Sequence, residues 1–199
     1  MTRTTPHGTA RTVRTARAAR AARTALADGV LAAATVATGL IAGAFLVFAC
    51  AVMPALARSD DRVYIEVMQN VNDVIQNPVF LLPLVGAPLL TAVSAWQVRT
   101  APHRRWIRWG LAAHGLAFLV TAFANVPLND GLAHAGAAAH LTDPAAVRGH
   151  FEDAWVAWNL VRTLLCTLAL VCLTRALLLR GGSHASAYFA SAAGSSASR

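Results

Sequence analysis

Four long apolar runs dominate the pattern of hydrophobic and polar positions along the chain. They cover approximately residues 29–52, 78–98, 107–126 and 154–174. About 20 predominantly apolar residues are needed for an α-helix to cross a bilayer, and each run is close to that length. The pattern therefore predicts an all-α fold, an integral membrane four-helix bundle that occupies residues 29–180.

The segment between the first two runs has a different pattern. Met53 and Pro54 are expected to end the first helix, and Ser59-Asp60-Asp61 then offers helix N-caps and acidic first-turn residues. Residues 61–77 then carry their polar side chains on one helical face (Glu66, Asn70, Asp73 and Asn77) and apolar side chains on the other (Tyr64, Val67, Met68, Val71 and Ile75). The segment is too polar to span a bilayer, so we predict an amphipathic extracytoplasmic helix that lies at the membrane interface or caps the bundle.

The two ends of the chain lack apolar periodicity. Residues 1–28 are rich in alanine, threonine and arginine, and residues 181–199 are rich in serine and alanine. Arginines recur at every third position (Arg11, Arg14, Arg17, Arg20 and Arg23), a period that spreads their charge around a helix. We expect a disordered basic cytoplasmic tail that contacts anionic membrane lipids, and a disordered C-terminal tail. Because no aromatic residue interleaves the arginines, we expect no nucleic-acid partner.

Composition supports the membrane interpretation. Of the 199 residues 56% are hydrophobic and 13% are charged, which is typical of a membrane protein. A signal peptide is the competing interpretation of the first run, but the usual apolar core of a signal peptide is only about 7–15 residues long. The three cysteines, Cys50, Cys166 and Cys172, lie in apolar runs without metal-ligand spacing, so we predict no metal site.

The distribution of charge predicts the orientation. With four spans, both termini lie on one side of the membrane, and all but four of the 17 arginines fall on that side. The exceptions are Arg58, Arg62, Arg148 and Arg162. Since cytoplasmic segments are enriched in basic residues, we expect a multi-pass protein of the cell membrane with both termini in the cytoplasm.

Arg162 is the one charge inside the last apolar run. A guanidinium within a membrane helix costs about 3 kcal/mol on insertion scales, so it needs a partner. Trp155 and Asn159 share its helix face, at i, i+4 and i+7. Glu66 is the expected ion-pair partner, with Asp130 as the second choice.

Further amides are expected at the same level of the bundle. Asn72, Asn125 and Asn129 come from two other segments, and buried polar groups at membrane depth usually face a bundle interior or a cavity. We interpret the group as a ligand-binding or catalytic site. The alternative is that the amides cap and join helices, and that Arg162 forms a purely structural ion pair.

Several short motifs, in this order, resemble those of a known family. They are Val52-Met53-Pro54-x-Leu56, Met68-Gln69-x-x-Asn72, Asn125-Val126-Pro127-Leu128-Asn129 and Trp155-x-x-x-Asn159-x-x-Arg162. The chain resembles the anthrone oxygenase-like family of small membrane proteins over residues 30–180. Most members of that family are classed as a domain of unknown function.

The resemblance implies oxidation of an anthrone methylene to a quinone carbonyl by dioxygen, without a metal or organic cofactor. In agreement, the sequence has no glycine-rich dinucleotide loop, HExxH motif or Cys/His cluster. On this hypothesis the catalytic residues are Arg162, Glu66 and His150, with one of the last two as the base. The substrate-binding residues of a lipophilic aromatic polyketide or quinol-like molecule are then Asn72, Asn125, Asn129, Trp155 and Asn159.

A second function remains open from the sequence. The spans contain no clear base near the polar group, because His114 is expected mid-helix and far from it. This favours a non-enzymatic membrane protein that binds a small lipophile or a partner protein. The oligomeric state is not indicated by the sequence.

The predicted orientation can be measured with single cysteines in a background without native cysteines. We expect Ala137→Cys to react with a membrane-impermeant thiol reagent added outside cells, because it lies in an extracytoplasmic loop. Thr100→Cys should react only after the membrane is opened. The opposite result would place the polar site on the cytoplasmic side.

Overall fold

The computed structural model describes the backbone of residues 7–98 and 103–196, and the side chains of residues 11–98 and 103–181. These residues form helices joined by short connections, with no strand in the described ranges. The elements are α1 (His7–Val47), η1 (Phe48–Val52), α2 (Met53–Leu56), α3 (Asp61–Val74), α4 (Pro78–Gln97), α5 (Arg104–Val120), η2 (Thr121–Asn125), α6 (Val126–His134), η3 (Ala138–His140) and α7 (Pro144–Ser196).

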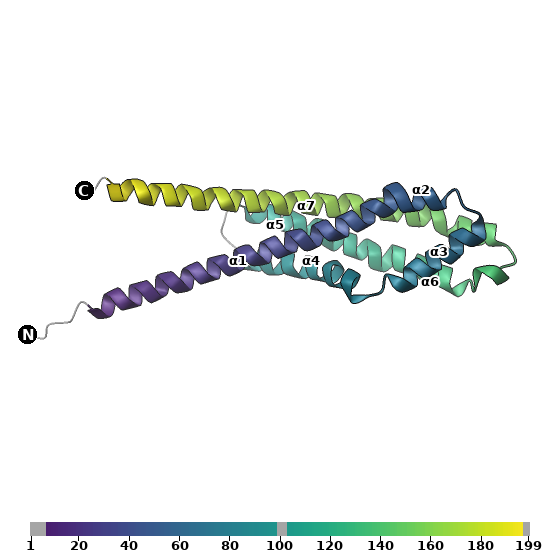
Figure 1. The fold of residues 1–199 in the computed structure, drawn as a ribbon, viewed down its shortest axis with the longest axis horizontal. Helices are drawn as coiled ribbons and strands as arrows, with labels where there is room; N and C mark the ends of the chain where they lie inside the picture. Colours follow the sequence, from purple (N-terminus) through teal and green to yellow (C-terminus); the bar gives the residue numbers. More distant parts are fainter. Residues whose placement is uncertain (1–6, 99–102, 197–199) are drawn as a thin grey trace, which may run out of the picture.

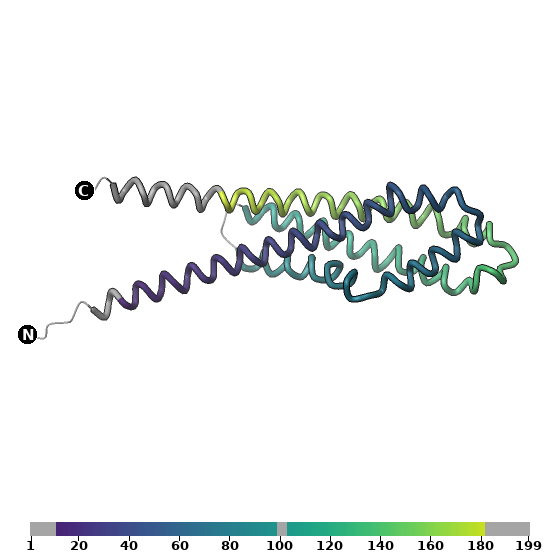
Figure 2. Tube along the Cα trace, in the orientation of Figure 1, coloured from purple at the N-terminus to yellow at the C-terminus, as the bar shows by residue number. Residues whose placement is uncertain are grey.

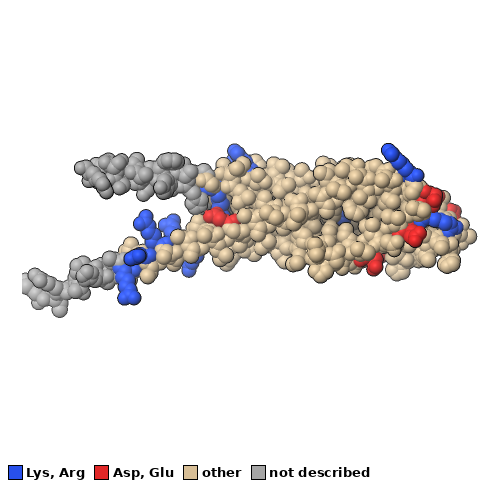
Figure 3. Space-filling model, viewed as in Figure 1, with Lys and Arg blue, Asp and Glu red and all other residues tan. Residues whose placement is uncertain are grey.

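Four helical stretches are long and apolar enough to cross a membrane, which confirms the predicted fold class. They are Arg11–Leu56, Pro78–Gln97, Arg104–His134 and Pro144–Gly181. Helix α1 contacts α4 and α7, and α5 contacts α4 and α7, so the four long helices form a closed ring (Figure 1). Charged side chains gather toward the two ends of the bundle and leave a largely uncharged middle (Figure 3).

Small side chains bring α5 and α7 close together. A Cβ atom added at Gly110 would lie 3.1 Å from Leu173 Cδ2 and 3.5 Å from the carbonyl oxygen of Ala169. Ala113 and Ala117 continue the buried face of α5. Close backbone approach is the usual way for membrane helices to gain packing contacts, because lipid and side chains are equally apolar.

Two π-helical turns, η1 and η2, interrupt the first and third spans. In each, a backbone N–H donates five residues back, from Met53 to Phe48 and from Val126 to Thr121. Pro54 and Pro127 follow directly, and proline has no N–H to donate to the carbonyl four residues earlier. The wider turn accommodates that loss. Contrary to our expectation, the first span therefore does not end at Pro54 but continues as α2.

Helix α3 and the 310 turn η3 cover one end of the bundle, here called the capped end. Of the three candidate cap residues, Asp60 caps α3, because its side chain accepts hydrogen bonds from the backbone N–H groups of Arg62 and Val63. Arg62 donates to the carbonyl oxygens of Ala138 and Leu141, and Gln69 Nε2 donates to those of Leu132 and Gly136. These bonds fix α3 across α6 and η3. Its buried side chains are Tyr64, Ile65 and Met68.

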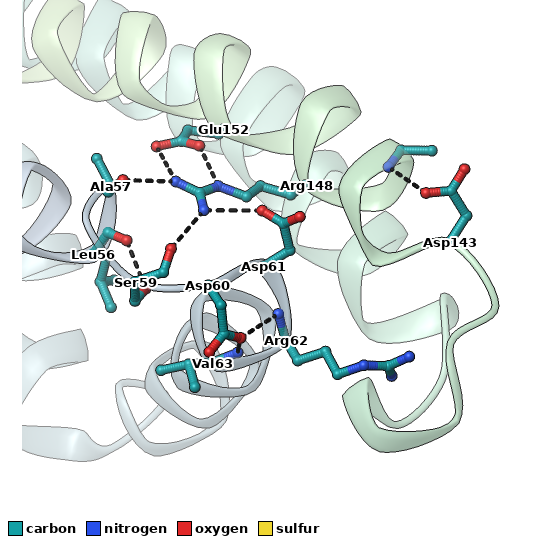
Figure 4. A network of polar contacts seen from close by, with 11 residues as sticks. Leu56, Ala57, Ser59, Asp60, Asp61, Arg62, Val63, Asp143, Arg148 and Glu152 are labelled. Atoms are coloured by element: carbon teal, nitrogen blue, oxygen red, sulfur yellow. Dashed lines mark hydrogen bonds and ion pairs between the residues drawn. The ribbon is translucent and has the colours of Figure 1, made fainter.

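An arginine that the sequence did not single out ties the capped end together (Figure 4). Arg148, on the first turns of α7, lies 2.6 Å from Glu152 and 3.0 Å from Asp61. It also donates to the carbonyl oxygens of Ser59 and Ala57. Its guanidinium lies 4.5 Å from the ring centre of Tyr64, whose pKa is raised mainly by burial. One side chain thus joins α7 to the α2–α3 connection.

The long helices α1 and α7 extend past the bundle into the two end segments of the chain. Helix α1 already begins at His7 and extends beyond α4 and α5 (Figure 2), and α7 continues to Ser196. Residues 1–6 and 197–199 lie outside the described ranges. Alanine and arginine have high helix propensity, and extending an existing helix needs no new nucleation. Near this end, Arg180 pairs with Asp28 at 2.7 Å and so joins α7 to α1.

The Arg148 cluster predicts a specific loss of stability. Arg148→Leu should lower the free energy of unfolding by about 2 kcal/mol, because it leaves the partly exposed carboxylates of Asp61 and Glu152 without their partner. Thermal unfolding of the purified protein in detergent measures the change. Arg58→Leu, an exposed arginine at the same end, is the control and should shift stability by less than about 0.5 kcal/mol. Equal effects would mean that the cluster contributes little.

Candidate functional site

A cavity of about 270 Å³ lies inside the bundle at the capped end. It is lined by residues from α1, η1, α3, α4, η2, α6 and α7, and from the connection between α3 and α4. The lining residues that carry polar groups or rings are Phe45, Phe48, Asn72, Gln76, Phe80, Thr121, Asn125, Asn129, Asp130, Trp155, Asn159 and Arg162. Aromatic walls with a few convergent polar groups are typical of small-molecule sites.

The side chains of Arg162 and Asn159 form the inner polar wall. Arg162 is 5% exposed and Asn159 is 1% exposed. Arg162 Nη2 donates to Asn159 Oδ1 at 3.0 Å, and Asn159 Nδ2 donates to the carbonyl oxygen of Phe45 at 3.1 Å. The Arg162 guanidinium also lies 4.3 Å from the ring centre of Phe45 and 5.5 Å from that of Trp155. An amide and two aromatic faces thus surround the charge.

The prediction that Arg162 forms an ion pair with Glu66 or Asp130 is wrong. All nine carboxylate side chains belong to the described residues, and none lies within 4 Å of the Arg162 guanidinium in an ion pair. Glu66 is exposed and does not line the cavity. The reason is the orientation of α3, which buries the face carrying Tyr64 and Met68 and so turns Glu66 away.

Trp155 forms an aromatic wall whose orientation is fixed. Its Nε1 donates to Asn129 Oδ1 at 2.8 Å, and its ring packs against Phe48 and Phe151 with centroids 5.8 and 6.1 Å apart. Because the indole N–H can only donate, Asn129 must present its oxygen to Trp155. The Nδ2 group of Asn129 is therefore available as a donor.

Several buried polar atoms of the cavity wall have no hydrogen-bond partner among the described residues. They are both side-chain polar atoms of Asn125, Nδ2 of Asn72 and Nε of Arg162. Asn125 is only 1% exposed, so its amide has left water without gaining a protein partner. Donors outnumber acceptors in this set, so the wall is suited to a ligand that carries a carbonyl or an anionic oxygen.

The structure brings most of the predicted site residues together around this cavity. Those that line it are Asn72, Asn125, Asn129, Trp155, Asn159 and Arg162. His150 does not, because it is exposed at the start of α7, where its Nδ1 donates to the carbonyl oxygen of Ala146 at 2.7 Å. Neither of the two predicted bases, Glu66 or His150, therefore lines the cavity.

Trp155 was predicted from the sequence, but the phenylalanines of the cavity wall were not, and Asp130 was considered only as a partner of Arg162. Phe45 and Phe80 line the cavity, although they look like ordinary apolar positions of their runs. Asp130 is the carboxylate that lines it, and its position directly after Asn129 was the available signal. His114 lies closer to the cavity than expected, since its neighbours Phe45, Leu84 and Thr121 also line the cavity.

The described residues contain no group of three or more His, Cys, Asp or Glu side chains that could hold a metal ion. What the cavity does offer is a guanidinium and amide N–H groups beside flat aromatic faces. Such donors, held in a site that excludes water, stabilise an oxyanion more strongly than water does.

A family model described as anthrone oxygenase matches residues 72–172. The match contains the Asn125–Asn129 and Trp155–Arg162 motifs, and it is shorter than the range over which we noted a resemblance. Comparisons with curated proteins and with solved structures found no match.

The hydrogen bonds predict that two buried amides contribute differently to the free energy of unfolding. Asn159→Leu should lower the free energy of unfolding by about 2 kcal/mol, because it leaves Arg162 without its amide acceptor and removes the side-chain bond to the Phe45 carbonyl oxygen. Asn125→Leu should change it by less than about 0.5 kcal/mol, because it removes polar atoms that have no protein partner. Thermal unfolding of both variants in the same detergent gives the comparison. A larger loss in Asn125→Leu would show that this amide holds the fold together.

Proposed function

Because the chain belongs to the anthrone oxygenase family, we propose that this membrane protein oxidises a lipophilic aromatic substrate in the cavity at the capped end. The substrate class is an aromatic polyketide or a quinol-like molecule, and the oxidant is dioxygen. The observation that carries the proposal is the Asn125 amide, buried and without a protein partner, beside the guanidinium of Arg162 in an aromatic-walled cavity.

The cavity suits a small, flat molecule. Ligand pockets usually measure about 300–1,000 Å³, so a cavity of about 270 Å³ favours a compact ligand. The rings of Phe48, Phe80 and Trp155 line the cavity and offer aromatic surface against which the substrate can pack. Asn125 and Arg162 then provide N–H donors for an oxygen on its edge.

The proposed reaction converts a CH₂ group beside two aromatic rings into a carbonyl. A base removes one proton, and the electron pair delocalises onto the existing carbonyl as an enolate. The carbanion carbon transfers electrons to O₂ and forms a hydroperoxide after protonation. Loss of water then leaves the second carbonyl, so that CH₂ and O₂ become C=O and H₂O. In this scheme no electron is passed to a resident cofactor.

Arg162 and Asn125 have separable roles in this scheme. The positive charge of Arg162 stabilises the enolate oxygen, and low polarity in the surrounding bundle strengthens that attraction. Asn125 donates a second hydrogen bond to the same oxygen or to a neighbouring hydroxyl group. Asn159 bonds both Arg162 and the Phe45 carbonyl oxygen, so in this scheme its role is to position the guanidinium.

The arrangement in the membrane is part of the proposal. The excess of arginine at the end where the termini lie favours a cytoplasmic location for that end in the cell membrane. The capped end and its cavity then face the extracytoplasmic side. The substrate would reach the cavity from the bilayer, where both a lipophilic aromatic molecule and dioxygen are soluble.

Oxygen consumption by membranes supplied with anthrone and hydroxyanthrones tests the proposal. Arg162→Leu should stay in the membrane, because it removes an insertion cost, but should lose activity at least about 100-fold. Arg162→Lys should also lose activity, because an ammonium group cannot form hydrogen bonds to Asn159 and to the substrate in one plane. Asn125→Leu should lose activity to a similar degree as Arg162→Leu.

Arg175→Leu, an exposed arginine on the same helix, is the matched control and should keep activity. Full activity of Arg162→Leu would refute the proposed role of the cavity. Saturable binding of the anthrone by the wild type without oxygen consumption would instead support a non-enzymatic lipophile-binding protein.

A further inference from the structure

Asp130 is the single carboxylate among the described residues that line the cavity. It lies on α6, one residue after Asn129, and its side chain is exposed. Its backbone oxygen accepts a hydrogen bond from His134 Nδ1 at 2.6 Å. The carboxylate itself makes no hydrogen bond or ion pair with another described residue, so both of its oxygens are free to accept a proton.

The other proton acceptors at this end of the bundle are poorly placed. Glu66 is exposed and outside the cavity lining, and His150 lies in a separate surface groove formed with Phe151 and Leu132. His114 is buried below the cavity, where Thr38 Oγ1 lies 3.5 Å from its Nδ1. A proton taken up by His114 would be enclosed in the apolar interior, whereas one taken up by Asp130 can leave to water.

We propose that Asp130 is the general base of the reaction, an inference that rests on the proposed function. The C–H bond of the substrate methylene breaks, an O–H bond forms on the Asp130 carboxylate, and the electron pair stays on the substrate as an enolate. The carboxylic acid then releases its proton to water at the exposed mouth of the cavity, which regenerates the carboxylate.

The positions of donor and base fit this step. Arg162 and Asn125 are buried, whereas Asp130 lies at an exposed edge of the same cavity. A substrate whose carbonyl points to the buried donors therefore presents another part of its ring system toward Asp130. Because the donors stabilise the enolate as it forms, a carboxylate suffices as the base.

Anaerobic deuterium exchange isolates the proposed proton transfer from the reaction with oxygen. Anthrone is incubated in D₂O with membranes under argon, and deuterium in its methylene group is measured by mass spectrometry against membranes without the protein. We expect the wild type to exchange the methylene protons above that background. Asp130→Asn should lose the added exchange and the aerobic oxygen consumption by about 100-fold or more.

Two further variants keep the inference testable. Asp130→Glu retains a carboxylate and should recover part of both rates, which separates loss of the base from loss of the fold. Asp73→Asn, an exposed carboxylate outside the cavity lining, should behave as the wild type. Anthrone binding, followed by quenching of tryptophan fluorescence, should persist in Asp130→Asn.

These measurements distinguish the role of Asp130 from the proposed oxidation itself. Exchange or oxygen consumption by Asp130→Asn at the wild-type rate would overturn the role of Asp130 and leave the proposed oxidation intact. Absence of both activities in the wild type would overturn the oxidation itself, and the base with it.

Discussion

The burial of Arg162 without a carboxylate is the constraint on which the site depends. Asn159 Oδ1 accepts one of its N–H groups, and the rings of Phe45 and Trp155 face the guanidinium. These groups are uncharged, so they hold the arginine in place without neutralising it. A carboxylate partner would have formed a closed, neutral pair. Without one, the positive charge remains directed at the contents of the cavity.

The two π-helical turns of the backbone lie next to the residues that hold and face Arg162. Asn159 bonds the carbonyl oxygen of Phe45, three residues before the π-helical turn η1, and Asn125 is the last residue of the turn η2. Both turns precede a proline that cannot supply the N–H of a regular helix. π-Helical turns are often found at functional sites, and here Phe48 of η1 and Asn125 of η2 both line the cavity.

Helical periodicity predicted most of this arrangement, and it also explains what was missed. The spacing of Trp155, Asn159 and Arg162 correctly placed them on one face, and hydropathy located all four spans. Asn72 lies four residues after the buried Met68 and so faces inward, whereas Glu66 lies on the opposite face of α3. Phe151 shares the face of Trp155, and its neighbour His150 does not. That no carboxylate pairs with Arg162 could not be predicted, because it depends on how α3 and α6 are rotated against α7.

The asparagines of the site look alike in the sequence but differ in their hydrogen bonds. Arg162 can only donate and the Phe45 carbonyl can only accept, so both ends of Asn159 are already used. Trp155 can only donate, which leaves Asn129 with a free donor. Asn125 has no protein partner for either atom. The free groups are thus mainly donors next to a retained positive charge. A cavity with this polarity favours an electron-rich oxygen, and it becomes more favourable as that oxygen gains negative charge during a reaction.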